Sequence, residues 1–410
     1  MGEPLDNPIK VMHLLSATHQ YVNSASANTL SAQLTPLLGR IDPQHVQMQV
    51  VNFAPGDRQA ALMRQLSVPV HDIELSRRRF APNALGELRQ RVGKFKPDVI
   101  HAWGHTAQLA TRLLPGAGRT VPMVWSMPAK IPNPNFDQES WLDRYKLNLL
   151  SKQAKRPAHL VYGSASGAAH YSRMGFPENT GCVINNGVDV DRFKPDAKQG
   201  QQLRAQLKLE ASSVVIGMHA AFMPENDYAT FIRACADLIK YQPNIHVIVA
   251  GRGVQRGNAG LMAMLGGGTL ATHTSLLGEW SDLNAFFNAC DVVCSSALDD
   301  GGATMLASAM LCGVPCVGTG KGMQGEVLFK QGITIESGSP AALSRGITRV
   351  LEMPADKRAY LIDSARKHII TNHSTQGAVQ KYLGLYLNMM HKVEVATAAQ
   401  AMKLTRAANG

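Results

Sequence analysis

The sequence DVVCSSALDDGGATMLASAMLCGVPCVGT, residues 291–319, decides the fold. It predicts a buried strand, a glycine-rich turn, a helix of small residues, and a second buried strand after Gly313-Val314-Pro315. A Gly-Gly turn that leads into a helix gathers backbone N–H groups and the positive end of the helix dipole at one point, which suits an anion such as phosphate. The residues expected to contact that anion are Gly301, Gly302, Ala303 and Thr304.

The chain around this segment repeats the alternation of short apolar runs and helical patterns. Strands are predicted at 10–15, 46–53, 97–101, 121–125, 159–162 and 182–184, with helices at 24–38, 83–95, 108–114, 141–154 and 166–174. The pattern then restarts with strands at 214–218, 246–250 and 275–277 and helices at 228–238, 283–289, 340–351 and 376–390. This order predicts an α/β protein with parallel sheets covered by helices on both faces.

A length of 410 residues is too great for one ordinary core. We therefore predict two domains, 1–185 and 186–375, with ligands bound at the carboxyl ends of their strands. An Ala-rich, polar tail over 393–410 is expected to fray.

The chain carries a net charge of +11, and its basic residues gather in the first half. They are Arg77-Arg78-Arg79, Arg89, Arg91, Lys94, Lys96, Lys146, Lys152, Lys155 and Arg156. Two interpretations stay open, a solvated surface and attraction to anionic lipid headgroups. No nucleic-acid partner is expected, because no recognition motif accompanies the charges.

The amino-terminal residues predict a cytoplasmic protein. Met1–Asn7 is polar and acidic, and the apolar run Ile9–Ser16 is too short to span a bilayer. The open interpretation of the basic residues adds peripheral association with the inner membrane.

Four cysteines have the suggestive spacings Cys290/Cys294 and Cys312/Cys316. Each lies in an apolar strand or a small-residue helix, whereas zinc or redox chemistry needs polar, accessible surroundings. We predict buried structural thiols and no metal site.

Seven segments, in order and with regular spacing, carry a resemblance to a known family. They are PDVIHAWGHTAQLATRLL (97–114), VINNGVDVDRFKP (183–195), PENDYATFIRA (224–234), VIVAGRGV (247–254), LLGEWSDL (276–283), DVVCSSA (291–297) and AMLCGVPCVGT (309–319). From about Pro97 to Tyr386 the chain resembles a bacterial family 4 glycosyltransferase with the GT-B fold.

The resemblance implies two Rossmann-like, doubly wound domains that face a central cleft. It also implies that a helix over 376–392 crosses back to the first domain. The second domain would hold a nucleotide-sugar donor, and the first would hold a glycan or lipid-linked acceptor for retaining transfer in surface polysaccharide biosynthesis. No metal or cofactor is implied, because such sites stabilise the departing diphosphate with Arg and Lys.

The chain departs from the family at its charged positions. The family pattern Arg-x-x-P-x-Lys places its two cations where this sequence has Ala221 and Asn226. Of two family glutamates, the first becomes Asp300 and the second becomes Ser308. Three features could supply the missing positive charge: Arg252, Lys321 and the helix that begins near Gly302.

Other residues are assigned to the same site. Asp300 is predicted to contact a sugar or ribose hydroxyl, with a helix N-cap as the alternative, and Asp299 competes for either role. Glu279 and Ser308 are further candidates for donor binding. In the first domain His105 could contact the acceptor or the sugar, or it could be a structural histidine. His13 and His101 are expected to be buried and hydrogen-bonded.

Two classes of function therefore remain open. One is an active glycosyltransferase. The other is a catalytically inactive relative that serves as a scaffold, binding a partner glycosyltransferase or a glycan. A GT-B epimerase or phosphorylase fits less well, since it also needs phosphate-binding cations.

Overall fold

The computed structural model describes residues 7–16, 30–53, 58–74, 82–114, 120–128, 141–155, 159–298 and 301–408. Two predicted donor residues, Asp299 and Asp300, lie outside this part of the chain. The described residues form two compact units. Unit 1 contains those up to Asn185 together with the segment from Ala378 onward, and unit 2 runs from Asn186 to Gly377.

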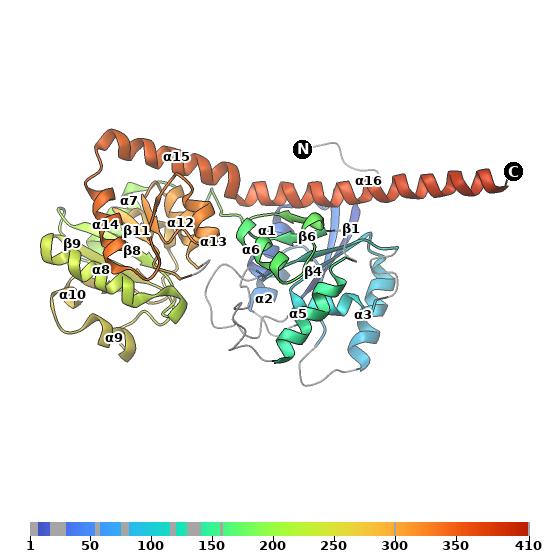
Figure 1. Ribbon diagram of the computed structural model, residues 1–410, viewed down its shortest axis with the longest axis horizontal. Coiled ribbons are helices and arrows are strands. Elements are labelled where there is room, and N and C mark those ends of the chain that lie inside the picture. Colours follow the sequence, from blue (N-terminus) through green and yellow to red (C-terminus); the bar gives the residue numbers. More distant parts are fainter. Residues whose placement is uncertain are drawn as a thin grey trace. The chain divides into compact units, whose positions relative to one another are not determined.

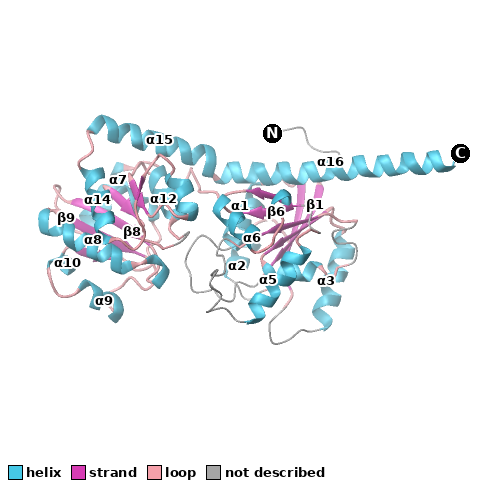
Figure 2. Ribbon diagram, in the orientation of Figure 1, coloured by secondary structure: helices cyan, strands magenta, loops and turns pink. Residues whose placement is uncertain are grey.

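Unit 1 is built on a parallel sheet of seven strands in the order β3-β2-β1-β4-β5-β6-β7. The strands are β1 (Ile9–Leu15), β2 (Val46–Asn52), β3 (Val70–Asp72), β4 (Val99–Trp103), β5 (Met123–Ser126), β6 (His159–Tyr162) and β7 (Gly181–Val183). All five residues of β4 are buried, as expected for a central strand covered on both faces. Figure 2 shows these strands in magenta, with helices around them.

The helices of unit 1 cover the sheet in two layers with separate cores. They are α1 (Leu30–Arg40), α2 (Arg58–Arg64), α3 (Pro82–Phe95), α4 (His105–Thr111), α5 (Trp141–Gln153), α6 (Ala165–Arg173) and most of α16 (Thr375–Ala408). Figure 1 shows α16 in red alongside this sheet. Its residues Val379, Tyr382, Tyr386 and Met389 share one core with β1 and β4 because they recur every three or four positions, on one face of the helix.

Unit 2 is built on a parallel sheet of six strands in the order β10-β9-β8-β11-β12-β13. The strands are β8 (Val214–His219), β9 (Ile245–Ala250), β10 (Thr274–Leu276), β11 (Val292–Cys294), β12 (Cys316–Gly318) and β13 (Ile333–Thr334). The strand order changes direction between β8 and β11. Both strands are central, so their carboxyl ends lie where α/β proteins commonly bind ligands.

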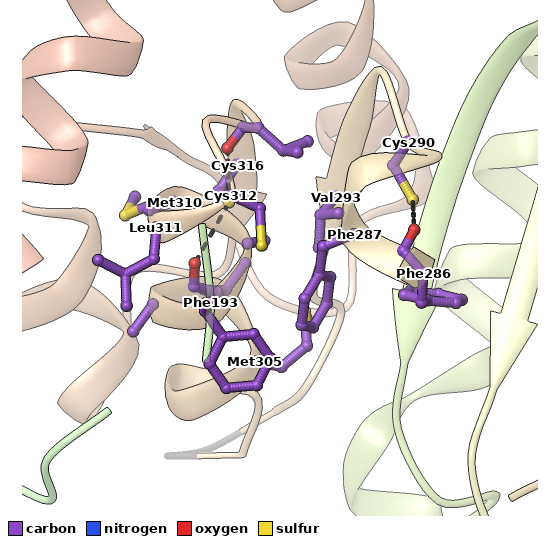
Figure 3. Close-up of a cluster of buried hydrophobic side chains, with 14 of the residues drawn as sticks. Phe193, Phe286, Phe287, Cys290, Val293, Met305, Met310, Leu311, Cys312 and Cys316 are labelled. Atoms are coloured by element: carbon purple, nitrogen blue, oxygen red, sulfur yellow. Dashed lines mark hydrogen bonds between the residues drawn. The ribbon is translucent and has the colours of Figure 1, made fainter. Parts of the chain in front are cut away.

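The helices of unit 2 are α7 (Ala197–Gln206), α8 (Tyr228–Tyr241), α9 (Ala259–Leu265), α10 (Thr269–Thr272), α11 (Leu283–Asn288), α12 (Ala303–Leu311), α13 (Gly322–Leu328), α14 (Pro340–Leu351) and α15 (Ala355–His373). In the core of this unit the rings of Phe193 and Phe287 lie 5.9 Å apart, beside Met305 of α12 (Figure 3). The Cys290 thiol donates a hydrogen bond to the Phe286 carbonyl. The small-residue helix therefore packs inside the unit.

The structure corrects several boundaries. The short edge strands β3 and β13 and the helices α2, α9, α10 and α13 have no counterpart in the prediction, because two to seven residues carry too little periodicity. The 19-residue α15 has no counterpart in the prediction either. The charged stretch 194–208 contains α7, which begins at the N-cap Asp196. The tail predicted to fray over 393–410 is helical as far as Ala408, in keeping with the high helix propensity of its alanines.

Candidate functional site

Backbone hydrogen bonds join the carboxyl ends of three neighbouring strands of unit 2. The Phe222 amide, after β8, donates to the Arg252 carbonyl, after β9, over 2.8 Å. The Gly251 amide donates to the Gly278 carbonyl, after β10, over 2.7 Å. The loops that follow these strands therefore lie against one another at one edge of the sheet.

The same edge continues across β11 and β12. The Ser296 hydroxyl, after β11, donates to the Asn226 carbonyl over 2.8 Å. The Leu298 amide donates to the Glu225 carbonyl over 2.9 Å. The Thr319 hydroxyl, after β12, donates to the Ala297 carbonyl, also over 2.9 Å. We call the loops 220–226, 251–253, 296–298, 301–304 and 319–322 the carboxyl edge of unit 2.

The loop 220–226 carries the two positions at which the resembling family has cations. The Asn226 side chain turns inward, and its amide donates a 2.8 Å hydrogen bond to the Ala221 carbonyl. Residues Pro224–Asn226 form a single 3₁₀ turn, followed by Asp227, which caps α8 by accepting from the Thr230 amide. The loop is thus held by neutral hydrogen bonds, and neither Ala221 nor Asn226 supplies a charge.

The glycine-rich turn leads into α12 as predicted. Gly302 is the N-cap residue, with φ 83°, and a Cβ at this position would lie 2.4 Å from the Ser295 hydroxyl oxygen. Only glycine fits there, and having no side chain Gly302 cannot itself cap the amino-terminal turn of α12. The helix begins at Ala303, so the N-cap predicted as an alternative role for Asp300 is occupied by Gly302.

The structure distinguishes among the remaining donor candidates. Ser308 is buried within α12, and its hydroxyl donates to the Thr304 carbonyl over 2.8 Å. Its proton is therefore committed to the helix backbone, which argues against the predicted role in donor binding. Lys321 is the exposed N-cap residue of α13, and Glu279 is exposed in the loop after β10. Arg252 is half-buried in the turn after β9.

In unit 1, His105 lies at the first position of α4, directly after β4. Its Nε2 is 3.4 Å from the hydroxyl of the buried Tyr171, and that hydroxyl donates to the Pro128 carbonyl. The Ser16 hydroxyl, after β1, accepts from the Ala107 amide in the first turn of α4. His105 is therefore positioned at the carboxyl edge of this sheet by a side chain from α6. No sequence pattern predicts this contact, because Tyr171 lies in α6, 66 positions from His105.

A polar layer lies beneath α16 in the interior of unit 1. The Tyr386 hydroxyl is 2.7 Å from His101 Nδ1, and His101 Nε2 is 2.8 Å from the Ser126 hydroxyl. The Trp103 indole donates to His13 Nδ1 over 3.0 Å. We call these five residues the histidine layer. Both histidines are buried as predicted, but His13 Nε2 has no hydrogen-bond partner among the described residues.

Burial lowers the pKa of His13 to about 3, and it lowers the pKa of His101 well below its usual value. Both rings are therefore neutral at neutral pH. The histidine layer fixes α16 to the sheet with neutral hydrogen bonds, which makes these histidines structural.

The cysteines are also structural. Cys290, Cys294, Cys312 and Cys316 are buried free thiols, as predicted. Burial raises the pKa of Cys290 and Cys294 well above the usual thiol value, so neither forms a thiolate readily. Across the described ranges, no group of three or more His, Cys, Asp or Glu side chains could hold a metal ion. The helices of the described residues include none that is long and apolar enough to cross a membrane.

Comparison with known proteins identifies the family. A model described as "Glycosyl transferases group 1" matches residues 200–368, and one described as "Glycosyltransferase Family 4" matches residues 40–192. EpsF of Bacillus subtilis (strain 168), whose name describes it as a glycosyltransferase, is 22% identical over 180 residues, which are 43% of this chain and 46% of EpsF. That match spans less than half the length of the curated relative.

Solved structures share the fold over nearly the whole chain. HepE from Anabaena, in complex with UDP, is similar with a TM-score of 0.78 and 20% identity, over 93% of this chain and 100% of that one. A glycosyltransferase from Rickettsia africae ESF-5 gives 0.75 and 15%, over 94% and 99%. WaaG, described as a glycosyltransferase involved in lipopolysaccharide biosynthesis, gives 0.65 and 12%, over 92% and 99%. With two parallel sheets and two family models in agreement, the chain belongs to the family 4-type glycosyltransferases and has their GT-B fold of two Rossmann-like domains.

Proposed function

We propose that this protein transfers a sugar from a nucleoside-diphosphate sugar to a glycan or lipid-linked acceptor, with retention of configuration. The carboxyl edge of unit 2 carries the proposal, because four of its loops lie against one another beside the amino terminus of α12, whose N-cap residue is a glycine. HepE, which has the same fold, has been solved with UDP and with UDP-glucose. A UDP-sugar is therefore the first donor to test.

The chemistry requires positive potential at the leaving group. As the glycosidic bond breaks, the departing nucleoside diphosphate gains negative charge, which oriented N–H groups and the helix dipole stabilise. We assign this role to the backbone of residues 301–304, at the beginning of α12. Asp299 and Asp300 would bind sugar or ribose hydroxyls, and Glu279 and Lys321 are secondary candidates at the same edge.

The acceptor is assigned to unit 1. His105 stands at the carboxyl edge of that sheet, held by Tyr171, and it could contact an acceptor hydroxyl. Basic residues on α3 and α5 would favour an anionic, lipid-linked acceptor at a membrane surface in surface polysaccharide assembly. Sedimentation with vesicles of anionic and of zwitterionic lipid tests this part. Binding confined to the anionic vesicles is expected, and equal binding to both would contradict it.

A second candidate function is a non-catalytic scaffold that binds a partner glycosyltransferase or a glycan. Two residues favour this alternative, because both lie at positions where the resembling family carries charge. The Asn226 amide donates to a carbonyl of its own loop, and the Ser308 hydroxyl donates to a carbonyl of its own helix.

Thermal unfolding with UDP-, GDP- and ADP-linked sugars separates the two functions. A donor at 100 times its dissociation constant should stabilise the protein by about 2.7 kcal/mol. We expect one nucleotide class to raise the unfolding temperature, and that donor to be slowly hydrolysed. A panel without any response would contradict donor binding and leave the scaffold as the better account.

A further inference from the structure

The turn Gly251-Arg252-Gly253 has a geometry that places one side chain beside the loop 220–226. Gly251 has φ 145°, and a Cβ there would lie 2.0 Å from the Ala220 carbonyl oxygen. The turn therefore packs backbone against backbone on the loop after β8, which only glycine permits. Arg252 is the one residue of the turn that has a side chain.

The Arg252 guanidinium reaches the stretch between the two lost cation positions. Its Nη2 lies 3.9 Å from the Met223 sulfur, and Met223 stands between Ala221 and Asn226 in the same loop. The guanidinium thus approaches from the β9 turn the place where the family pattern supplies charge from the β8 loop. Arg252 therefore brings a positive charge from a different part of the sequence to the same loop, 220–226.

Arg252 also differs from the other half-buried arginines of unit 2. Among the residues that the structure describes in this unit, those are Arg204, Arg358 and Arg366, and each donates to at least one oxygen. Within the described part of the chain Arg252 has only the thioether contact, and a thioether is a weak acceptor. A guanidinium offers five N–H donors, and it binds phosphate oxygens with two parallel hydrogen bonds.

We propose that Arg252 binds the diphosphate of the donor and takes the place of the cations absent at positions 221 and 226. The inference rests on the proposed donor site at the carboxyl edge of unit 2. It assigns the diphosphate, and not the nucleoside or the sugar, to this side chain. Because a thioether holds the guanidinium only weakly, the ligand displaces no strong hydrogen bond.

The test is isothermal titration of the full chain with a nucleoside diphosphate and with the matching nucleoside. UDP, GDP and ADP are tried first on the wild-type protein, and the tightest binder is used for the variants. Arg252→Gln removes the positive charge. Arg252→Lys keeps the charge but cannot form the bidentate pair of hydrogen bonds that a guanidinium forms with phosphate. Arg256→Gln is the matched control, because Arg256 is an exposed arginine of the same connection between β9 and α9.

We expect Arg252→Gln to weaken diphosphate binding by about ten- to a hundredfold and to leave nucleoside binding unchanged. Arg252→Lys should fall between that variant and the wild type, and Arg256→Gln should match the wild type. Equal diphosphate affinity in wild type and Arg252→Gln would overturn the assignment of Arg252 alone. If the wild type binds none of the three diphosphates, the donor site itself is wrong and the inference fails with it.

Discussion

The carboxyl edge of unit 2 and the histidine layer of unit 1 use polar groups in opposite ways. In the histidine layer, polar side chains of β1, β4 and β5 are buried together with Tyr386 of α16, and their hydrogen bonds fix α16 to the sheet. At the carboxyl edge the structure is held by backbone and glycine, and the half-buried Arg252 has no oxygen partner among the described residues. A cluster of titratable side chains therefore marks the structural region here, and the sparser edge is the candidate site.

The largest effect on stability is expected from a substitution that distorts the turn after β9 at the carboxyl edge. Gly251→Ala places a methyl group against the Ala220 carbonyl at a backbone angle unfavourable for alanine. We expect a loss of about 3 kcal/mol or more in the free energy of unfolding, measured by chemical denaturation. Gly257→Ala is the control, since a Cβ at Gly257 meets nothing within 4 Å. Equal stability of the two variants would show that close approach does not shape this turn.

The pH dependence of stability tests the histidine layer. The pKa of His13, about 3 in the folded protein, lies below its usual value of 6.5, so the folded state disfavours the protonated ring. Stability is therefore full above pH 6.5 and falls as the pH drops from 6.5 toward 3, by about 1.4 kcal/mol per pH unit for each proton. Urea titrations between pH 7 and pH 4 should show a slope smaller by about one proton in His13→Asn.

The control for this comparison is His391→Asn, since His391 is exposed on α16. It should keep the wild-type slope. A His13→Asn protein with the full wild-type slope would place the acid sensitivity elsewhere.

The hydrogen bonds beneath α16 can be compared one at a time. Tyr386→Phe removes the 2.7 Å partner of His101 Nδ1 and leaves a buried polar atom unpaired, which costs about 1–3 kcal/mol. Tyr382→Phe removes a contact of 3.5 Å with the Ser126 hydroxyl, so its effect on the unfolding free energy should be smaller. Equal effects of the two variants would show that packing, and not the hydrogen bond, holds α16 in place.

The smallest effect is expected from a double substitution that restores the two positive charges of the family pattern. Ala221→Arg with Asn226→Lys should tighten nucleoside-diphosphate binding by about tenfold, since a hydrogen bond to a charged group contributes about 1.5–3 kcal/mol before losses from crowding. Titration calorimetry measures this change. Unchanged or weaker binding would mean that the loop 220–226 does not face the diphosphate.

The sequence predicted the fold well, because both sheets consist of buried strands that read as short apolar runs. The start of α12 was also predictable, since the Gly301-Gly302 turn has a clear signature. The role of Ser308 was not, because its bond to the Thr304 carbonyl depends on rotation about one side-chain bond. Nor was the bond of Tyr386 to His101, which joins residues 285 positions apart in the sequence.

The central claim is that the carboxyl edge of unit 2 recognises a nucleoside diphosphate. Hydrogen–deuterium exchange of the full chain, with and without the tightest-binding diphosphate, tests it most directly. The account predicts slower exchange in peptides covering 220–226, 251–258 and 296–304, and little change in those covering β1, β4 and α16. Protection confined to unit 1, or none at saturating ligand, would contradict it.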